Sequence, residues 1–268
     1  MKRFSFSEIN FQRVTSALLR RVLDIPHAWA WSLSIQAYQN RERLSHFKDI
    51  HAGKRCFILG NGPSLAKMDL TPLKDEFTFG ANRIYLLFNE TDFRPTYYVS
   101  INELVLQQFA DDIKALPFPK FLNWNSRFLF GKRDDIFYLR IKPNLFDSFT
   151  KDITRPISSG GTVTFVALQL AYYMGFSEVI LIGVDHNFVD KGTPNLTATR
   201  MADRDINHFH PNYFPKGYKW QFPDLVRSEI AYQLARRVFE TSGRRIADAT
   251  IGGQCPVFEK VEWTAIFG

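Results

Sequence analysis

The chain has 268 residues, 45% of them hydrophobic and 15% aromatic, and it carries a formal net charge of +7. This composition excludes a disordered chain, and no apolar stretch reaches the roughly 18 to 20 residues that a membrane-spanning helix needs. The N-terminal residues lack the apolar core of a secretory signal, and the two cysteines, Cys56 and Cys255, have no metal-ligand spacing. We therefore predict a cytoplasmic protein without disulfides.

The excess positive charge is unevenly distributed. Residues 1–50 hold eight Lys or Arg and four Asp or Glu, so four of the seven excess charges lie there. Within residues 11–23, apolar side chains recur on one helical face and arginines lie on the others. Such a basic helix suits peripheral contact with the inner face of an anionic membrane, or a partner; the alternative is docking on its own domain. No nucleic-acid-binding motif occurs, so we expect no nucleic acid partner.

From about residue 54 the chain alternates between predicted strands and helices. Short apolar runs predict strands at 55–60, 77–82, 96–102, 120–124, 135–141 and 178–185. Helices are predicted at 103–116, 162–175 and 223–243. This order predicts a doubly wound, mostly parallel α/β sheet of the Rossmann-like type over residues 51–268, preceded by a helical segment over residues 1–50.

One long segment interrupts the alternation. Residues 186–222 are polar, aromatic and rich in Gly and Pro, and they directly follow the strand that ends at Asp185. A connection of this length without regular elements is unusual in a compact domain and often serves as an active-site lid. We therefore predict a lid over the carboxyl ends of the strands.

Two glycine-containing loops are the first candidates for ligand binding. The loop after the first strand contains Gly60, Asn61, Gly62 and Ser64. Glycine lets backbone N–H groups approach a phosphate, and the Asn61 amide offers donors and an acceptor. The loop is not the dinucleotide fingerprint, because Leu65 stands where the third glycine belongs, and no Walker lysine follows. The alternative is a tight turn without a ligand.

The second loop contains Ser158, Ser159, Gly160 and Gly161 at the start of the helix predicted for residues 162–175. Unpaired N–H groups and the positive end of the helix dipole make such a position suitable for an anion. The alternative is an ordinary serine cap with close packing at glycine. Together the two loops favour a phosphorylated ligand.

The motifs GNGPSL, GANRIY and SSGGTVTFVALQLAYYMGFSEVILIGVDH, in this order, resemble those of bacterial sialyltransferases that use CMP-sialic acid. They are even more similar to the related domains named after the archaeal hydroxymethyl-dihydropterin diphosphokinase, a group that includes the motility-associated factors proposed to glycosylate flagellin. The likeness spans about residues 54–255 and implies a GT-A-like nucleotide-binding fold that works without metal.

The resemblance also implies roles for individual residues. Asn61, Asn82 and the Ser159–Gly160 turn match positions that surround the CMP moiety in the sialyltransferases. A lid histidine acts there as general base and lid tyrosines hold the departing phosphate, which makes His208 or His210 the base and Tyr213 and Tyr218 the phosphate contacts. Asp185, at the end of a strand, completes the predicted catalytic set.

His208 is the first choice for the base because His210 precedes Pro211, which restricts its backbone. The leading prediction is transfer of a sialic-acid-like sugar from a CMP-sugar donor to a glycan, lipid-linked or protein acceptor, with no cofactor. The second is a diphosphokinase that uses ATP and Mg²⁺, with Asp185, Asp203 and Asp205 as possible metal ligands. The third is a non-catalytic nucleotide-binding module.

Overall fold

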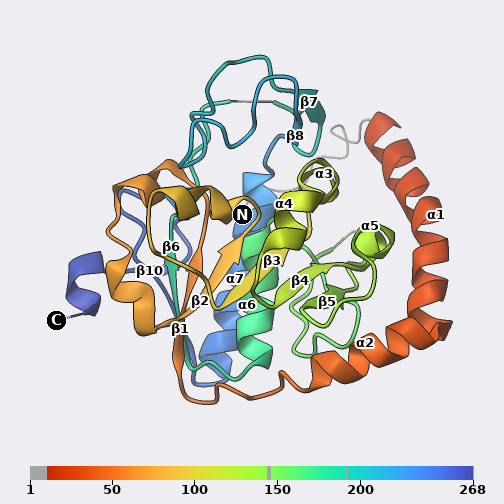
Figure 1. The fold of residues 1–268 in the computed structure, drawn as a ribbon, viewed down its shortest axis with the longest axis horizontal. Coiled ribbons are helices and arrows are strands. Elements are labelled where there is room, and N and C mark those ends of the chain that lie inside the picture. The colour runs from red at the N-terminus through yellow and green to blue at the C-terminus, as the bar shows by residue number, and fades with distance from the viewer. Residues whose placement is uncertain (1–10, 144–145, 191, 268) are drawn as a thin grey trace.

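The computed structural model describes residues 11–143, 146–190 and 192–267, and in α1 it describes the side chains of residue 19 and of residues 21 onward (Figure 1). Within these residues, eight strands form one sheet in the order β10-β9-β6-β1-β2-β3-β4-β5, and every neighbouring pair runs parallel. The strands are β1 Arg55–Leu59, β2 Phe77–Ala81, β3 Tyr97–Ser100, β4 Lys120–Asn123, β5 Ile136–Leu139, β6 Glu178–Ile182, β9 Arg245–Asp248 and β10 Glu259–Lys260. The predicted Rossmann-like α/β fold is confirmed.

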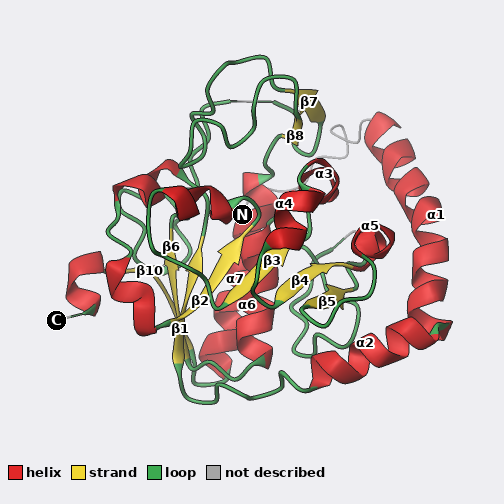
Figure 2. Ribbon diagram, viewed as in Figure 1, coloured by secondary structure: helices red, strands yellow, loops and turns green. Residues whose placement is uncertain are grey.

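Helices flank this sheet (Figure 2). They are α1 Phe11–Leu33, α2 Ile35–Ser45, α3 Glu103–Gln108, α4 Ala110–Ala115, α5 Arg127–Phe130, α6 Val163–Tyr173 and α7 Leu225–Thr241. The helix predicted over 103–116 is broken at Phe109, whose φ of −128° and ψ of 31° are not helical. The buried Phe109 ring lies between the Arg83 guanidinium and the Tyr218 ring, so tertiary packing overrides the helical pattern.

The core explains why the central strands are apolar throughout. From Cys56 to Leu59 every side chain of β1 is at most 1% exposed, because helices cover both faces of a parallel sheet. Both Cys56 and Cys255 are buried free thiols. Strands β9 and β10 are not predicted from the sequence, because they are short and have no apolar run, with Arg245, Glu259 and Lys260 among their residues.

The N-terminal helices dock on the outer edge of the sheet. The Asn40 side chain of α2 pairs with the backbone N–H and C=O of Tyr138 in edge strand β5, both at 2.8 Å, and so covers groups that an edge strand would leave open. Asp24 forms an ion pair with Arg140, and the Trp31 and Trp124 rings meet edge to face at 5.2 Å. From Asp24 onward this segment is therefore attached to its own domain.

Part of α1 remains open to solvent. Leu19, Val22, Leu23, Trp29 and Leu33 are all more than half exposed. The apolar positions 11, 14 and 18 of the predicted membrane-facing stripe lie outside the described side chains. None of the described helices is long and apolar enough to cross a membrane.

The 186–222 segment rises above the carboxyl ends of the strands, at the top of Figure 1. It contains two short antiparallel strands, β7 Thr197–Thr199 and β8 Lys219–Gln221, where we had predicted no regular element. The backbone N–H of Phe209 donates to the carbonyl of Asn61 at 3.0 Å, so the segment lies directly on the loop that follows β1.

Candidate active site

The strand order places the candidate site at β1, from which the chain builds the sheet in two opposite directions. Strand β1 lies between β2, which follows it in the chain, and β6, from which the sheet continues to β9 and β10. Ligands of open α/β sheets bind outside the carboxyl ends of the strands at such a point. The loop after β1 and the residues after β6 meet there.

The glycines of the first loop are required by the packing of two chain segments. A Cβ on Gly60 would lie 2.2 Å from the Gly183 carbonyl oxygen, and one on Gly62 would lie 1.9 Å from Oδ2 of Asp185. Their N–H groups donate to the carbonyls of Ile182 and Gly183, at 2.8 and 2.9 Å. Both amides are therefore paired with the end of β6 and the residue after it, and the predicted contact of Gly60 and Gly62 with a phosphate stays a prediction.

Asp185 is engaged by the same loop. Its carboxylate accepts hydrogen bonds from the backbone N–H of Ser64 at 3.0 Å and from the Ser64 hydroxyl at 2.6 Å. These bonds tie the short 3₁₀ helix Pro63–Lys67 to the end of β6. The Asp185 carboxylate is thus paired with Ser64 in this structure, and its predicted catalytic role stays a prediction.

Asn61 is different from its neighbours. Its side-chain oxygen Oδ1 is buried and has no hydrogen-bond partner among the described residues. A buried acceptor without a partner costs about 1–3 kcal/mol, so a native structure rarely keeps one without a reason. A ligand that brings a hydrogen-bond donor to this oxygen would remove that cost.

Asn82 lies at the corresponding position after the neighbouring strand. Leu59 of β1 pairs with Gly80 of β2. Asn61 and Asn82 each come two residues later, so they lie at equivalent positions beyond the ends of the two strands. Asn82 adopts a left-handed conformation with φ of 49°, its Oδ1 accepts the Ser100 hydroxyl at 3.0 Å, and its carbonyl accepts the Tyr98 hydroxyl. Its side-chain NH₂ makes no bond to a described residue and is available to a ligand.

The second loop already holds an anion, and this anion belongs to the chain itself. The carboxylate of Asp147 accepts the Gly160 N–H at 3.2 Å and two hydrogen bonds from the Arg227 guanidinium, at 2.6 and 2.9 Å. Arg227 also reaches the Ser159 hydroxyl at 3.4 Å. The hydrogen bond to Asp147 raises the pKa of Arg227. Asp147 therefore occupies the place where the sequence predicted a phosphate.

Other groups of this loop are paired as well. The Gly161 N–H donates to the Ser159 hydroxyl at 3.5 Å, and Thr162, not a serine, caps α6 by accepting from the N–H of Thr164. The Ser158 hydroxyl accepts the N–H of Ser148 at 3.1 Å. Ser158 is thus part of the support beneath the loop.

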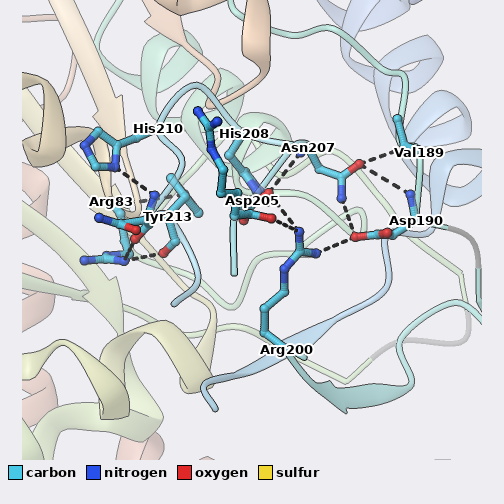
Figure 3. A network of polar contacts seen from close by, with 11 residues as sticks. Arg83, Val189, Asp190, Arg200, Asp205, Asn207, His208, His210 and Tyr213 are labelled. Carbon is cyan, nitrogen blue, oxygen red and sulfur yellow. Dashed lines mark hydrogen bonds and ion pairs between the residues drawn. The ribbon is translucent and has the colours of Figure 1, made fainter. Parts of the chain in front are cut away.

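His208 forms a dyad with Asp205 (Figure 3). Nδ1 of His208 lies 2.9 Å from Oδ2 of Asp205, and the imidazole stacks on the Tyr213 ring with centroids 3.9 Å apart. Burial alone would raise the pKa of Asp205, but hydrogen bonds from His208 and from the Asn207 backbone, together with the charges of His208 and Arg200, hold it below its usual value. An ionised carboxylate only accepts, so Nδ1 carries the proton.

Nε2 of His208 makes no hydrogen bond to a described residue, so it is the ring nitrogen that can face a substrate. The dyad is held from behind by a polar network: Arg200 pairs with Asp190, and the Asn207 side chain donates to Asp190 at 2.7 Å. This arrangement is that of a general base with an orienting carboxylate.

His210 has no such freedom. Its Nδ1 accepts the N–H of Asn212 at 3.1 Å, and its Nε2 lies 3.6 Å from Glu90. His210 therefore anchors the 186–222 segment, and the geometry favours His208 of the two histidines.

The two predicted phosphate-binding tyrosines lie in different surroundings. Tyr213 is 1% exposed, its hydroxyl accepts the Arg83 N–H at 3.3 Å, and burial raises its pKa. In this conformation it supports the His208 ring and does not face a ligand. Tyr218 is 38% exposed, and its ring stacks on the Phe109 ring, which also contacts the Arg83 guanidinium.

The Asp-x-Asp triplet of this segment does not form a pair of carboxylates. Asp203 is exposed and forms an ion pair with Lys216, whereas Asp205 is buried against His208. Among the described residues, no group of three or more His, Cys, Asp or Glu side chains could hold a metal ion.

Comparison with known proteins assigns the family. The family model described as "6-hydroxymethylpterin diphosphokinase MptE-like" matches residues 33–191, more than half of the chain. The chain belongs to this family. The match includes both glycine loops, Asn82 and Asp185, and it ends before His208 and Arg227.

One solved structure has a related arrangement, the MAf glycosyltransferase from Magnetospirillum magneticum AMB-1. It is 16% identical with a TM-score of 0.49, over 83% of this chain and 37% of its own. The present chain therefore spans little more than a third of that protein. No curated protein sequence matches.

Three residues of the site carry no signal in the sequence. Asp147 lies in an irregular stretch with no motif, and Arg227 reads as an ordinary solvated residue in the first turn of α7. Arg83 lies inside the quoted GANRIY motif, but nothing in the motif shows that its guanidinium binds the carbonyls of Asn212 and Tyr213. Each of these contacts joins residues more than 70 positions apart, so no local pattern encodes it.

Proposed function

We propose that the protein is a glycosyltransferase that moves a sialic-acid-like sugar acid from a CMP-sugar donor to a hydroxyl acceptor. The observation that carries this proposal is the buried, unpaired side-chain oxygen of Asn61, close in the fold to a histidine with an unbonded ring nitrogen. Oδ1 of Asn61 has no donor, and Nε2 of His208 has none either, while the residue after His208 is bonded to Asn61. A donor nucleotide at Asn61 would therefore lie next to the base.

The proposed reaction assigns a role to each group. The acceptor oxygen attacks the anomeric carbon of the donor, the bond from that carbon to the phosphate oxygen breaks, and CMP leaves with the bonding electrons. Nε2 of His208 takes the acceptor proton, and Asp205 stabilises the imidazolium that forms. The 186–222 segment acts as the lid that brings this base over the donor.

The nucleotide is held by side chains in this proposal. The free NH₂ of Asn82 and the unpaired oxygen of Asn61 supply one donor and one acceptor to the cytidine. Arg227 supplies positive charge to the phosphate, once the phosphate competes with Asp147 for the guanidinium. The resemblance of the motifs to those of the sialyltransferases supports the choice of CMP.

Turnover of CMP-sialic acid, followed as release of CMP, tests the proposal, together with thermal shifts against CMP, CDP, CTP, ADP and ATP with and without Mg²⁺. We expect stabilisation by cytidine nucleotides, because a ligand that binds the folded state raises the melting temperature by mass action. Stabilisation by ATP with Mg²⁺ alone would contradict it.

The family description favours one alternative, a diphosphokinase that transfers pyrophosphate from ATP to a hydroxymethylpterin. In that case Mg²⁺ would bind with the nucleotide, and Asp185 would have to leave Ser64 to reach it. The ATP arm of the same screen tests this alternative, with formation of AMP as its signature.

We also propose that α1 makes peripheral contact with an anionic membrane. Its Leu19, Leu23 and Trp29 are exposed, and so is Arg21 on the same helix. Apolar contact combined with positive charge predicts binding to anionic vesicles that weakens as salt increases. Sedimentation with phosphatidylglycerol vesicles tests this, with Leu23→Glu expected to bind less than wild type. Equal binding by the two proteins would contradict it.

A further inference from the structure

A second candidate site lies where the N-terminal helix meets the edge of the sheet. A cavity of about 470 Å³ opens between α1, α3 and α5, whose labels lie close together in Figure 1. Its lining residues are His27, Glu103, Gln107, Asn125, Ser126, Phe128 and Leu129. Neither glycine loop contributes to it.

The Glu103 carboxylate gives this cavity a hydrogen-bond acceptor with spare capacity. Its two contacts, with the side-chain amides of Asn123 and Asn125, are both 3.5 Å long and therefore weak. A carboxylate can accept several bonds, so Glu103 can take hydroxyl protons from a ligand. Its negative charge also disfavours an anionic ligand.

His27 supplies a donor. Its Nδ1 lies 2.9 Å from a guanidinium nitrogen of Arg127, and because arginine only donates, Nδ1 accepts and Nε2 carries the proton. Burial, followed by the charge of Arg127, lowers the pKa of His27, so the ring is neutral near pH 7. The cavity thus combines a neutral N–H donor, a carboxylate, three residues with amide or hydroxyl groups and an aromatic ring.

Phe128 gives the cavity an apolar face. Its ring is 79% exposed, and the Arg127 guanidinium lies 4.1 Å from the ring centroid. An exposed aromatic ring beside convergent polar groups matches a ligand that has both C–H faces and hydroxyl groups, as a pyranose ring does.

A second cavity adjoins the first on the side of the proposed base. This second cavity, of about 340 Å³, shares Gln107 with the first and is lined also by Arg83 and Tyr218. The backbone N–H of Arg83 binds the hydroxyl of Tyr213, and Tyr213 carries the His208 ring. The second cavity therefore lies on the Arg83 side of the contacts that hold the His208 ring.

We propose that the cavity lined by His27, Glu103 and Phe128 is the acceptor subsite and that it binds an uncharged, hydroxyl-rich saccharide. This inference rests on the proposed function, because it names the acceptor for the same reaction. It also gives α1 a direct part in the site, since His27 is the contribution of that helix to the cavity.

Saturation-transfer NMR with methyl β-galactoside, lactose and free sialic acid tests the subsite without any turnover. We expect the neutral saccharides to bind wild type, and Phe128→Ala and Glu103→Gln each to weaken binding by about tenfold. The matched controls are Tyr38→Ala and Glu42→Gln, which change an exposed aromatic and an exposed glutamate on α2, outside the cavity. Both controls should bind as wild type does.

Absence of binding by the neutral saccharides, a preference for free sialic acid, or equal weakening by the control variants would overturn the subsite. CMP titration of the same variants separates the two proposals. Saccharide binding lost in Phe128→Ala with CMP affinity unchanged supports both. Saccharide binding that depends on Phe128, in a protein that binds no CMP, would retain the subsite and reject the proposed donor.

Discussion

The two glycine loops and the 186–222 segment differ in whether their polar groups already have hydrogen-bond partners within the fold. In the loops, the N–H groups of Gly60, Gly62 and Gly160 are all paired, with β6 or with Asp147. In the segment, His208 has one ring nitrogen fixed by Asp205 and the other free. The glycine N–H groups are therefore paired within the fold, whereas one ring nitrogen of His208 is open to a substrate.

This difference shows where ligand binding is to be sought. A glycine in a tight loop can be required by a neighbouring backbone as readily as by a ligand, and the short distances at Gly60 and Gly62 decide for the backbone. An unpaired buried acceptor such as Oδ1 of Asn61 has no such structural explanation.

Replacing the proposed base should have the largest effect. A general base contributes ~10²–10⁴-fold, so His208→Gln should lower kcat for CMP-sugar turnover by that order while CMP affinity is retained. The matched control is His210→Gln, whose imidazole is already held by Asn212 and Glu90 and whose loss should cost far less. Equal losses in both variants would remove the distinction between the two histidines.

A methyl group at Gly62 should disrupt the first loop. The added Cβ of Gly62→Ala would displace the Asp185 carboxylate and leave the N–H and hydroxyl of Ser64 unpaired, at about 1–3 kcal/mol for each group. Chemical denaturation measures the free energy of unfolding. Gly131→Ala is the control, because its Cβ would meet no atom within 4 Å and only its positive φ opposes the change. A smaller loss for Gly62→Ala than for the control would contradict the packing explanation.

The sheet could be predicted from the sequence because its central strands are continuous apolar runs between Gly- and Asp-containing loops. The six predicted strands all form, but β9 and β10 are too short and charged to be recognised. The site was predicted less completely. Asn61 and His208 have recognisable chemistry, whereas Asp147 and Arg227 become neighbours only through packing across 80 positions.

Removing the Asp147 carboxylate tests whether the second loop can accept a ligand phosphate in its place. If Asp147 occupies the phosphate position, Asp147→Asn frees Arg227 and should tighten CMP binding by about tenfold, equivalent to 1.4 kcal/mol. Isothermal titration calorimetry measures the change. Glu240→Gln, which removes the partner of Arg236 at the exposed end of α7, should leave the affinity unaltered. Weaker CMP binding in Asp147→Asn would mean that the Asp147–Arg227 pair shapes the site instead of competing for it.

Acidification should loosen the docking of α1 by a small amount. Burial and the charges of Arg127 and Arg140 lower the pKa of His27 below 6.5, against the opposing charges of Asp24 and Glu103. Between the folded and unfolded pKa values the unfolded chain binds more protons. The contribution of His27 is therefore fully present above pH 6.5 and is lost as the pH falls toward the folded pKa.

Hydrogen exchange of residues 24–33 between pH 7 and pH 5 measures this docking. After correction for the intrinsic pH dependence of exchange, protection should fall on acidification in wild type and change less in His27→Gln. Identical changes in the two proteins would exclude His27 as the cause.

Thermal unfolding of Asn61→Leu, with and without CMP, tests the central claim most directly. If Oδ1 of Asn61 is kept unpaired for a ligand, an apolar side chain of similar size should remove that cost, so the free variant should melt at or above the wild-type temperature. The stabilisation that CMP gives to wild type should at the same time be lost. A variant that melts well below wild type and retains the full CMP shift would show that Asn61 serves the fold and not the ligand.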